Sequence, residues 1–304
     1  MSTAAKIFSW TLALAFAGIL GAAPTFDWEA AKEPHPGIKI IRAKYRSPRL
    51  MRVVIMRIDL STPGLRIVTT GRDADWGKPM PDCPKFTIAA KRITTAEFMK
   101  RANAENSGKR PMLAAFNASP WLPWQKPFTH KYGDPRGLNI SDGTVVSDNS
   151  PELPSFVVWQ NGKIEIAETV DRRKIGRIRE AVSGFGIIVK NGKCILPDVG
   201  YAKRPMPRMA YGLSHDRRYL YVIAIDGRQK NWSLGATGSE TGKLLVEAGA
   251  WDAINMDGGG SATLCVWDAG KKRPVMLNRQ TAKGYQRPVG SNVGIVFEDR
   301  PESR

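Results

Sequence analysis

The chain has 304 residues, of which 46 are Lys or Arg and 28 are Asp or Glu, so its formal net charge is +18. A hydrophobic content of 42% with 9% aromatic residues excludes a disordered, collagen-like or coiled-coil chain and allows a sizeable core. The positive charge suits a nucleic acid, an acidic glycan, a phosphorylated polymer or an anionic membrane, and charge alone does not choose among these partners.

Residues 1–23 have the features of a secretory signal. A single charge at Lys6 precedes an apolar run over residues 7–20, and small residues follow it. The run is shorter than the roughly 20 apolar residues that cross a bilayer comfortably, although an uncleaved membrane anchor is the alternative. We therefore expect a signal peptide over residues 1–23 and a secreted or periplasmic protein. Nucleic acid is not an expected partner, because export separates the chain from it and no binding motif is present.

The cysteines and histidines do not indicate a metal site. Three cysteines, Cys83, Cys194 and Cys265, are too few and too scattered for a disulfide framework or a CxxC site, although one disulfide remains open. The three histidines show no metal-ligand spacing, and Walker A, GxGxxG, HExxH and GxSxG strings are missing. The sequence therefore predicts neither a metal nor a cofactor.

The first half of the chain alternates strands with one helix. Runs rich in β-branched residues predict strands over residues 38–45, 51–60 and 65–69. Apolar residues at helical spacing predict an amphipathic helix over residues 86–104, followed by a buried strand over residues 111–117. The next loop carries Trp121 and Trp124, which either fill the edge of a core or stack on sugar faces.

The second half is β-rich and carries one capped helix. Thr237 and Glu240 form an S/T-x-x-E capping box that predicts a helix over residues 238–248, and Gly249 lies at its end. Turn signals and apolar runs predict strands over residues 155–160, 163–167, 186–190, 219–225, 253–256, 261–267 and 292–297.

We find no repeat and no long linker, so we expect one α+β domain over residues 24–304. Its core would be a mixed, mostly antiparallel β-sheet with a few packed helices.

The string from Asp257 to Ser261 contains three consecutive glycines, Gly258, Gly259 and Gly260. Such a turn can adopt positive φ angles, approach a ligand closely and aim its N–H groups at an anion. The alternative is a glycine-rich hairpin in which Asp257 only forms the turn. Asn255 and Asp257 alternate with apolar residues, so both point to one face of the strand, which favours a site.

Other polar residues follow strand ends, and each has a structural alternative. Glu240 can bind the backbone at the start of its own capping box, and Asp226 can be an ordinary turn residue. Arg208 and Arg228 carry guanidinium forks that match phosphate oxygens. Ser261 is disfavoured as a nucleophile because no histidine adjoins it.

Taken together, the strings over residues 208–212, 225–228, 233–240, 253–263 and 287–292 resemble the phosphodiester glycosidase family. The resemblance covers about residues 111–298, and the glycine triplet is its strongest motif. Asn117-Ala-Ser-Pro-Trp121 stands where members commonly have Asn-Gly followed by aromatic residues, which implies a different loop on the substrate side. The basic segment over residues 24–110 lies outside the resemblance.

The resemblance implies hydrolysis of a sugar-1-phosphodiester at the anomeric C–O bond, giving a free sugar and a phosphomonoester. Asp257 and Glu240 would then activate water or stabilise an oxocarbenium-like centre, with Asp226 beside them. Arg208 and Arg228 would hold the phosphate. The other expected substrate-binding residues are Asn117, Asn255, Gly258, Gly259, Gly260, Ser261, Arg287 and Asn292.

Two alternative functions remain open at this stage, and both take an anionic or phosphorylated glycan as partner. One is a non-catalytic envelope module that binds a polyanion, and the other is a phosphodiesterase that cleaves the P–O bond. Residues 24–207 carry 31 basic and 18 acidic side chains, whereas residues 208–299 carry 12 and 9. Most of the excess charge therefore precedes the motifs, which suggests a surface that associates with an anionic envelope or polymer.

Overall fold

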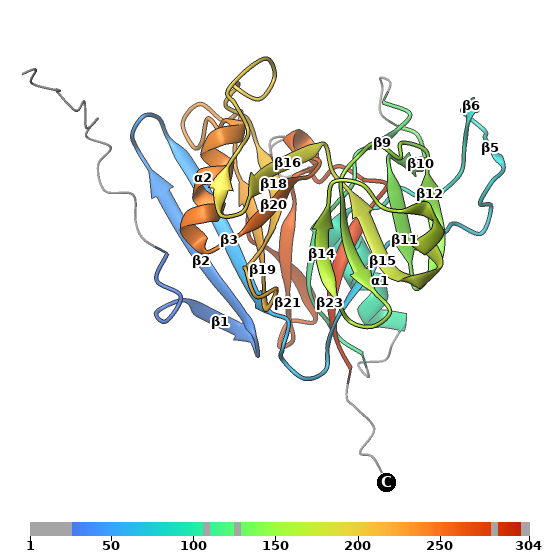
Figure 1. Ribbon diagram of the computed structural model, residues 1–304, viewed down its shortest axis with the longest axis horizontal. Helices are drawn as coiled ribbons and strands as arrows, with labels where there is room; N and C mark the ends of the chain where they lie inside the picture. Colours follow the sequence, from blue (N-terminus) through green and yellow to red (C-terminus); the bar gives the residue numbers. More distant parts are fainter. Residues whose placement is uncertain (1–25, 106–109, 125–128, 281–284, 299–304) are drawn as a thin grey trace, which may run out of the picture.

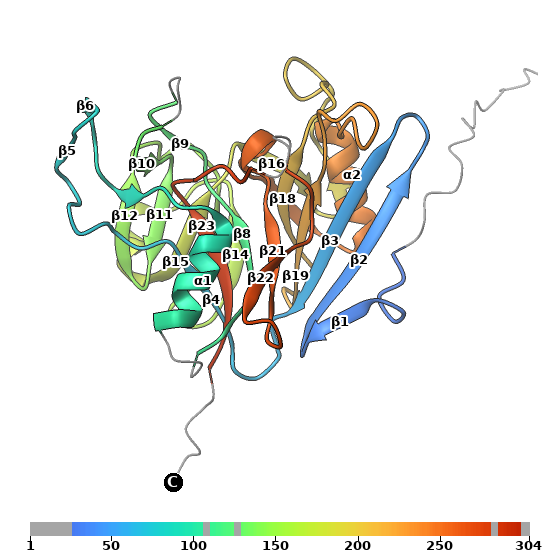
Figure 2. The ribbon, with the colours of Figure 1, turned by 180° about the vertical axis from the view of Figure 1, so that it is seen from behind.

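A computed structural model of the chain describes residues 26–105, 110–124, 129–280 and 285–298, and the expected signal segment lies outside this part. Three large antiparallel sheets, two small ones and two α-helices form one α+β domain within the described residues, as expected (Figures 1 and 2). No helix in the described part of the chain is long and apolar enough to cross a membrane.

The largest sheet has eight strands and pairs the N-terminal strands with strands from the second half of the chain. In spatial order they are β1 (Lys32–His35), β2 (Ile38–Tyr45), β3 (Met51–Asp59), β19 (Tyr219–Ile225), β18 (Arg208–Leu213), β20 (Asp252–Asn255), β16 (Gly186–Lys190) and β17 (Lys193–Cys194). In β3, Val54 and Met56 face the central core, whereas Val53 and Ile55 face the opposite side, which α2 (Gly238–Ala248) covers. Burial on both faces explains the unbroken apolar run of this strand.

The second and third sheets have five strands each. The second contains, in spatial order, β22 (Arg273–Met276), β21 (Leu264–Asp268), β8 (Met112–Asn117), β23 (Asn292–Phe297) and β4 (Leu65–Thr69). Its outer face is covered by α1 (Thr95–Glu105), which buries Met99 there. The third contains β12 (Thr144–Asp148), β11 (Leu138–Ser141), β15 (Ile178–Ser183), β13 (Ser155–Trp159) and β14 (Ile164–Ala167).

Shorter elements complete the described chain. They are the paired strands β5 (Pro79–Met80) and β6 (Cys83–Thr87), the three-stranded group β7 (Ala90–Lys91), β10 (Tyr132–Pro135) and β9 (Trp121–Leu122), and 3₁₀ turns at Arg172–Arg177 and Gly259–Ser261.

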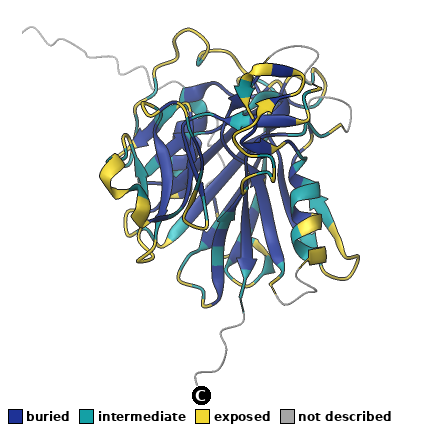
Figure 3. Cartoon of the chain, turned by 90° about the vertical axis from the view of Figure 1, so that its right-hand side faces the viewer, coloured by how far each residue is buried: buried dark blue, intermediate teal, exposed yellow. Residues whose placement is uncertain are grey.

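One aromatic residue from each large sheet meets in the middle of the molecule. Tyr211 of β18 packs edge-on against Phe116 of β8 and Phe156 of β13, with ring centroids 5.0 and 5.9 Å apart. All three side chains are fully buried, and Figure 3 shows that buried strands fill the middle of the molecule. The three sheets therefore share one hydrophobic core, which holds their strand ends in fixed relative positions.

The helix expected over residues 86–104 is wrong in its first half, because α1 begins only at Thr95. Ile88 and Ile93 instead make backbone hydrogen bonds to Lys78 and Val289. The Thr94 hydroxyl accepts a hydrogen bond from the N–H of Glu97, which starts the helix there. The apolar spacing was thus produced by two extended segments that precede the helix.

The strand expected over residues 261–267 also starts later, at Leu264, since Gly259–Ser261 forms a 3₁₀ turn. The N-terminal strands β1 to β4 are part of the same sheets as the later strands. β19 pairs with β3 along the whole length of β19, and β4 pairs with β23.

Candidate active site

A cavity of about 570 Å³ lies where β20 ends and the connections around it meet. It is lined by apolar and charged side chains from segments that are far apart in the sequence. Of the predicted site residues, those that line it are Arg208, Arg228, Asn255, Asp257, Gly258, Gly259, Gly260 and Arg287. The predicted glycine turn is therefore part of the cavity wall.

The turn is fixed from beneath by Asn117, the last residue of β8. Its Nδ2 donates to the carbonyl of Asp257 at 2.7 Å, and its Oδ1 accepts from the N–H of Thr263 at 2.9 Å. The Tyr211 hydroxyl donates to the Asn117 carbonyl at 2.5 Å. Asn117 does not line the cavity; it ties both ends of the glycine turn to the central core.

Each glycine of the turn allows a contact that a side chain would block. A Cβ on Gly258 would lie 2.7 Å from the carbonyl oxygen of Pro207, and one on Gly260 would lie 2.6 Å from Nη2 of Arg287. Gly259 has a φ of +60°, which glycine adopts without strain. Its N–H donates to the Pro207 carbonyl at 3.0 Å, so this amide is not available to a bound anion.

Asp257 brings a buried carboxyl to the cavity. The residue is 8% exposed, and its Oδ2 has no hydrogen-bond partner among the described residues; the same holds for Oγ of Ser261. Burial raises the pKa of the Asp257 carboxyl to about 6, against the opposing effects of the Ser261 hydroxyl and the Arg287 charge. A buried, unsatisfied carboxyl is costly to the fold and is typical of a functional site.

Two arginines flank the glycine turn. Arg287 packs against Gly260 and lies over the Trp124 ring, 5.1 Å from its centroid. Arg228 lies against Gly259 and donates to the Tyr201 hydroxyl at 3.4 Å. The φ of Arg228 is +57°, an unfavourable value for a residue with a side chain.

Arg208 is differently placed. Its Nε donates to the carbonyl of Ala236 at 3.0 Å, and its Nη2 donates to the carbonyls of Ala202 and Arg204 at 3.1 and 2.9 Å. Burial lowers the pKa of its guanidinium. Arg208 borders the cavity, but most of its donors hold the backbone of the surrounding wall.

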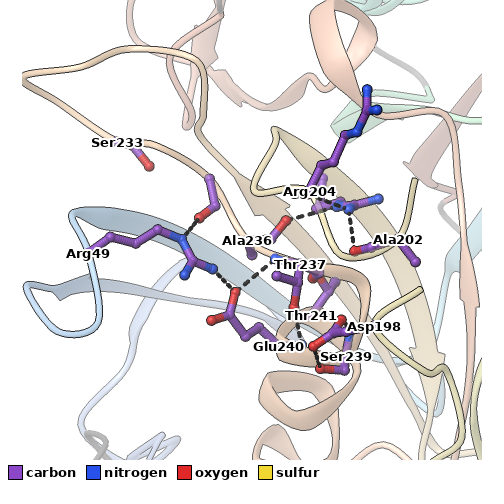
Figure 4. Close-up of polar contacts among 12 residues, drawn as sticks. Arg49, Asp198, Ala202, Arg204, Ser233, Ala236, Thr237, Ser239, Glu240 and Thr241 are labelled. Carbon is purple, nitrogen blue, oxygen red and sulfur yellow. Dashed lines mark hydrogen bonds and ion pairs between the residues drawn. The ribbon is translucent and has the colours of Figure 1, made fainter. Parts of the chain in front are cut away.

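Glu240 and Asp226 do not line the cavity. The Glu240 carboxylate completes the capping box by accepting the N–H of Thr237 at 2.8 Å, and it forms an ion pair with Arg49 (Figure 4). Asp226 accepts hydrogen bonds from Nε1 of Trp232 at 2.6 Å and from a backbone N–H at 2.8 Å. Both carboxylates therefore make structural hydrogen bonds: Glu240 caps its helix and Asp226 holds a turn, which are the structural alternatives expected from the sequence.

Ser261 and Asn292 also lie outside the lining. Asn292 pairs with Asn117 in the register between β23 and β8, and its Oδ1 accepts a hydrogen bond from Oγ1 of Thr95 at 2.7 Å. Asn255 faces the cavity from the end of β20, and no hydrogen bond of its side chain is seen within the described residues.

The two tryptophans of the loop after β8 differ in environment. Trp121 is 1% exposed and lies under Arg92, whose guanidinium is 3.9 Å from the ring centroid. Trp124 is 49% exposed. Trp121 therefore fills the core while its edge lines the cavity together with Trp124, and stacking of either ring on a sugar stays a prediction.

Sequence reasoning missed much of the cavity wall, which comes from connections without regular structure. The missed lining residues include Arg136, Phe185, Leu196, Tyr201 and Met206. These connections carry bulky apolar residues close to glycine and proline, and that pattern is the sequence signal that could have indicated a cavity wall.

The connection between β17 and β18 is held against the start of α2. Asp198 accepts hydrogen bonds from the hydroxyl and the N–H of Ser239, at 2.6 and 3.2 Å (Figure 4). The N–H of Gly238 donates to the Ala202 carbonyl at 2.8 Å. This part of the wall therefore has a defined position.

The phosphodiester glycosidase family model matches residues 124–296. No curated protein sequence matches the chain. Among solved structures, the catalytic domain of zebrafish N-acetylglucosamine-1-phosphodiester alpha-N-acetylglucosaminidase, auto-inhibited by its pro-peptide, superposes with a TM-score of 0.60 at 17% identity. The match covers 89% of this chain and 86% of that one.

Two bacterial structures also match. A hypothetical protein of Synechocystis gives a TM-score of 0.55 at 11% identity, covering 86% of this chain and 62% of that one. A Burkholderia pseudomallei protein described as exported gives 0.54 at 15% identity, covering 81% and 74%. At these identities the likeness is one of fold.

Proposed function

The chain belongs to the phosphodiester glycosidase family, and from this premise we propose that it hydrolyses a sugar-1-phosphodiester at the anomeric C–O bond. The products are a free sugar and a phosphomonoester. The observation that carries the proposal is the buried carboxyl of Asp257, whose Oδ2 has no hydrogen-bond partner within the described residues, in the same turn against which Arg228 and Arg287 pack.

In the proposed reaction, Arg228 and Arg287 bind the phosphate and stabilise the charge that develops on it as the C–O bond breaks. Asp257 faces the anomeric carbon, where its carboxylate activates the attacking water, and Asn255 orients the sugar. Among the lining residues that the structure describes, Asp257 is the one carboxylate. A single carboxylate suffices here, because a phosphate leaves as a stable anion and needs little help from a general acid.

This assignment changes the roles expected from sequence. Arg287 replaces Arg208 as the second phosphate-binding arginine, because the Arg208 donors hold backbone carbonyls. Glu240 caps α2 and has no catalytic role in this proposal, since its carboxylate already bonds to Thr237 and Arg49.

The test is hydrolysis of a panel of methyl glycosyl-1-phosphates in ¹⁸O-labelled water. Label in the sugar is expected, because water attacks carbon. Label in the phosphate would instead identify a phosphodiesterase that cleaves the P–O bond. No turnover of any diester, combined with salt-sensitive binding of a polyanion by both the wild type and Asp257→Asn, would favour a non-catalytic envelope module.

We also propose that the protein is exported and associates with an anionic envelope through the basic residues that precede residue 208. The apolar segment over residues 7–20 supports export, and the 31 basic against 18 acidic side chains over residues 24–207 support the association. Cell fractionation with N-terminal sequencing tests export. Recovery of the full-length chain from the cytosol would refute it.

A further inference from the structure

The cavity has an apolar side that the proposed chemistry does not use. Phe185, Leu196 and Met206 line it together with the ring of Tyr201. Phe185 is 50% exposed and Tyr201 62% exposed, although both are bulky side chains of a cavity wall. Large exposed apolar side chains that gather at a polar site mark a surface that a ligand covers.

The apolar surface continues along the connection between β17 and β18. Beyond the lining residues, Ile195 is 48% exposed and Val199 is 63% exposed. Asp198 ties this connection to the start of α2 by hydrogen bonds. Arg208 donates to the carbonyls of two residues in the connection and so also holds its backbone. Its exposed apolar side chains are therefore presented by a fixed backbone, in the same connection as the lining residues Leu196 and Tyr201.

We propose that the substrate is an amphiphile, a sugar-1-phosphate whose second ester is to a long-chain aliphatic alcohol, and this inference rests on the proposed function. The sugar and phosphate occupy the side of Asp257, Arg228 and Arg287, and the chain lies along Phe185 and Leu196 toward Val199. Leucine, methionine, isoleucine and valine offer no hydrogen bonds to hydroxyls. A second sugar on this side would leave its hydroxyl groups unpaired, whereas an aliphatic chain would gain burial.

The reaction balances without any further reactant. Water attacks the anomeric carbon, the C–O bond breaks, and its electron pair goes to the phosphate oxygen. The hydroxyl of the water remains on the sugar and its proton passes through Asp257 to solvent. The second product is the phosphate monoester of the aliphatic alcohol.

The decisive measurement is binding, which does not depend on turnover. Isothermal titration calorimetry compares octyl phosphate with ethyl phosphate, both below the concentration at which octyl phosphate forms micelles. We expect octyl phosphate to bind roughly tenfold more tightly or better, because additional methylene groups leave water. Equal affinities would overturn the inference. Tighter binding of phenyl phosphate than of octyl phosphate would also overturn it, in favour of an aromatic group.

Two variants test the location of the chain-binding surface. Phe185→Ser and Val199→Ser should each reduce the preference for octyl phosphate at least threefold while the affinity for ethyl phosphate changes little. Both side chains are half exposed or more, so their removal leaves the core intact. Trp76→Ser is the control, because Trp76 is 43% exposed and does not line the cavity. An unchanged preference in Phe185→Ser would place the alkyl group elsewhere and refute the inference.

A kinetic comparison separates the two proposals. Octyl and methyl diesters of the same sugar-1-phosphate should differ in kcat/KM in the direction of the binding preference. Tight octyl phosphate binding without hydrolysis of either diester would refute the proposed function and keep the apolar subsite. Equal hydrolysis of both diesters, with equal binding of both phosphates, would keep the function and refute the amphiphilic substrate.

Discussion

At the scale of single residues, the buried carboxylate of Asp257 lowers the stability of the fold but is the group that the proposed reaction needs. Its pKa rises from an ordinary 3.8 to about 6 on folding, so the folded state holds the proton more tightly than the unfolded chain. Stability is therefore lost as the pH rises from about 4 to 6, and it remains lower above that range. In the proposed reaction, the same burial gives the carboxylate the basicity that water activation requires.

Replacing Asp257 should separate these two effects. Asp257→Asn should reduce kcat/KM at least about 100-fold through loss of the base. It should also increase the free energy of unfolding at pH 7 by about 1–3 kcal/mol, because no charge is buried. Urea unfolding and diester hydrolysis measure the two quantities.

The matched control is Asp226→Asn, which alters a buried carboxylate outside the cavity. It should leave kcat nearly unchanged, since Asp226 does not line the cavity and accepts hydrogen bonds from Trp232 and Arg279. Full activity in Asp257→Asn would remove Asp257 from the proposed mechanism.

The pKa of Asp257 also predicts the pH dependence of the reaction. Because the ionised form activates water, log(kcat/KM) should fall with a slope of one as the pH drops below about 6. Protonation of Asp257 does not destabilise the fold, so circular dichroism at pH 5 should remain native. A rate that stays constant between pH 7 and pH 4.5 would contradict the assignment.

At the scale of elements, the glycine turn and α2 have separate tasks. The turn brings two arginines close to Asp257 because its glycines lack side chains. The capping box of α2 fixes the helix start against which the cavity wall rests. In the proposed function, the first element binds the substrate, whereas the second stabilises the cavity wall.

Gly260→Ala should displace Arg287, because the added Cβ would lie 2.6 Å from its Nη2. We expect KM for the diester to rise about tenfold through loss of a charged contact to phosphate. Gly176→Ala is the control, as no atom lies within 4 Å of its added Cβ. An unchanged KM in Gly260→Ala would argue against phosphate binding by Arg287.

Glu240→Gln should act on stability alone. Loss of the ion pair with Arg49 and weakening of the capping box should cost about 1–2 kcal/mol in a urea titration. The value of kcat should change by less than about threefold, because Glu240 does not line the cavity. A 100-fold fall in kcat with normal stability would restore the catalytic role expected from sequence.

Elements with strong local signals were predicted within a residue or two. β2, β19 and α2 have the expected bounds, because a continuous apolar run or a capping box specifies each of them locally. The extended segment before α1 was missed, because it is formed by pairing with distant partners such as Val289. Tyr201 and Phe185 were missed for a related reason, since only the folded sheets bring their connections to Asp257.

At the scale of the whole molecule, the N-terminal strands are part of the shared core. β2 and β3 bury Ile40 and Met56 against it, and β4 extends the second sheet. The family model begins its match only at residue 124, yet the strands before that point complete two of the three large sheets.

A fragment over residues 111–298 should therefore not fold alone. Removing β3 and β4 exposes full-length strand edges and an apolar face, which favours aggregation. Size-exclusion chromatography and circular dichroism should show aggregates without a cooperative thermal transition. The chain from residue 26 onward should remain monodisperse. A cooperative transition in the fragment would show that the N-terminal strands are dispensable.

The hydrogen bond from Asn117 to the Asp257 carbonyl joins the end of β8 to the connection that follows β20, whereas Trp124, Phe185 and Tyr201 lie on other connections between strands. In the proposed function, the carboxylate that activates water and the side chains that contact the aglycone therefore lie on different connections of one chain. Connections can be exchanged between relatives, by evolution or by grafting, without moving the carboxylate. We expect that replacing the segment between β17 and β18 with that of a relative would keep the proposed reaction and change the aglycone that is accepted.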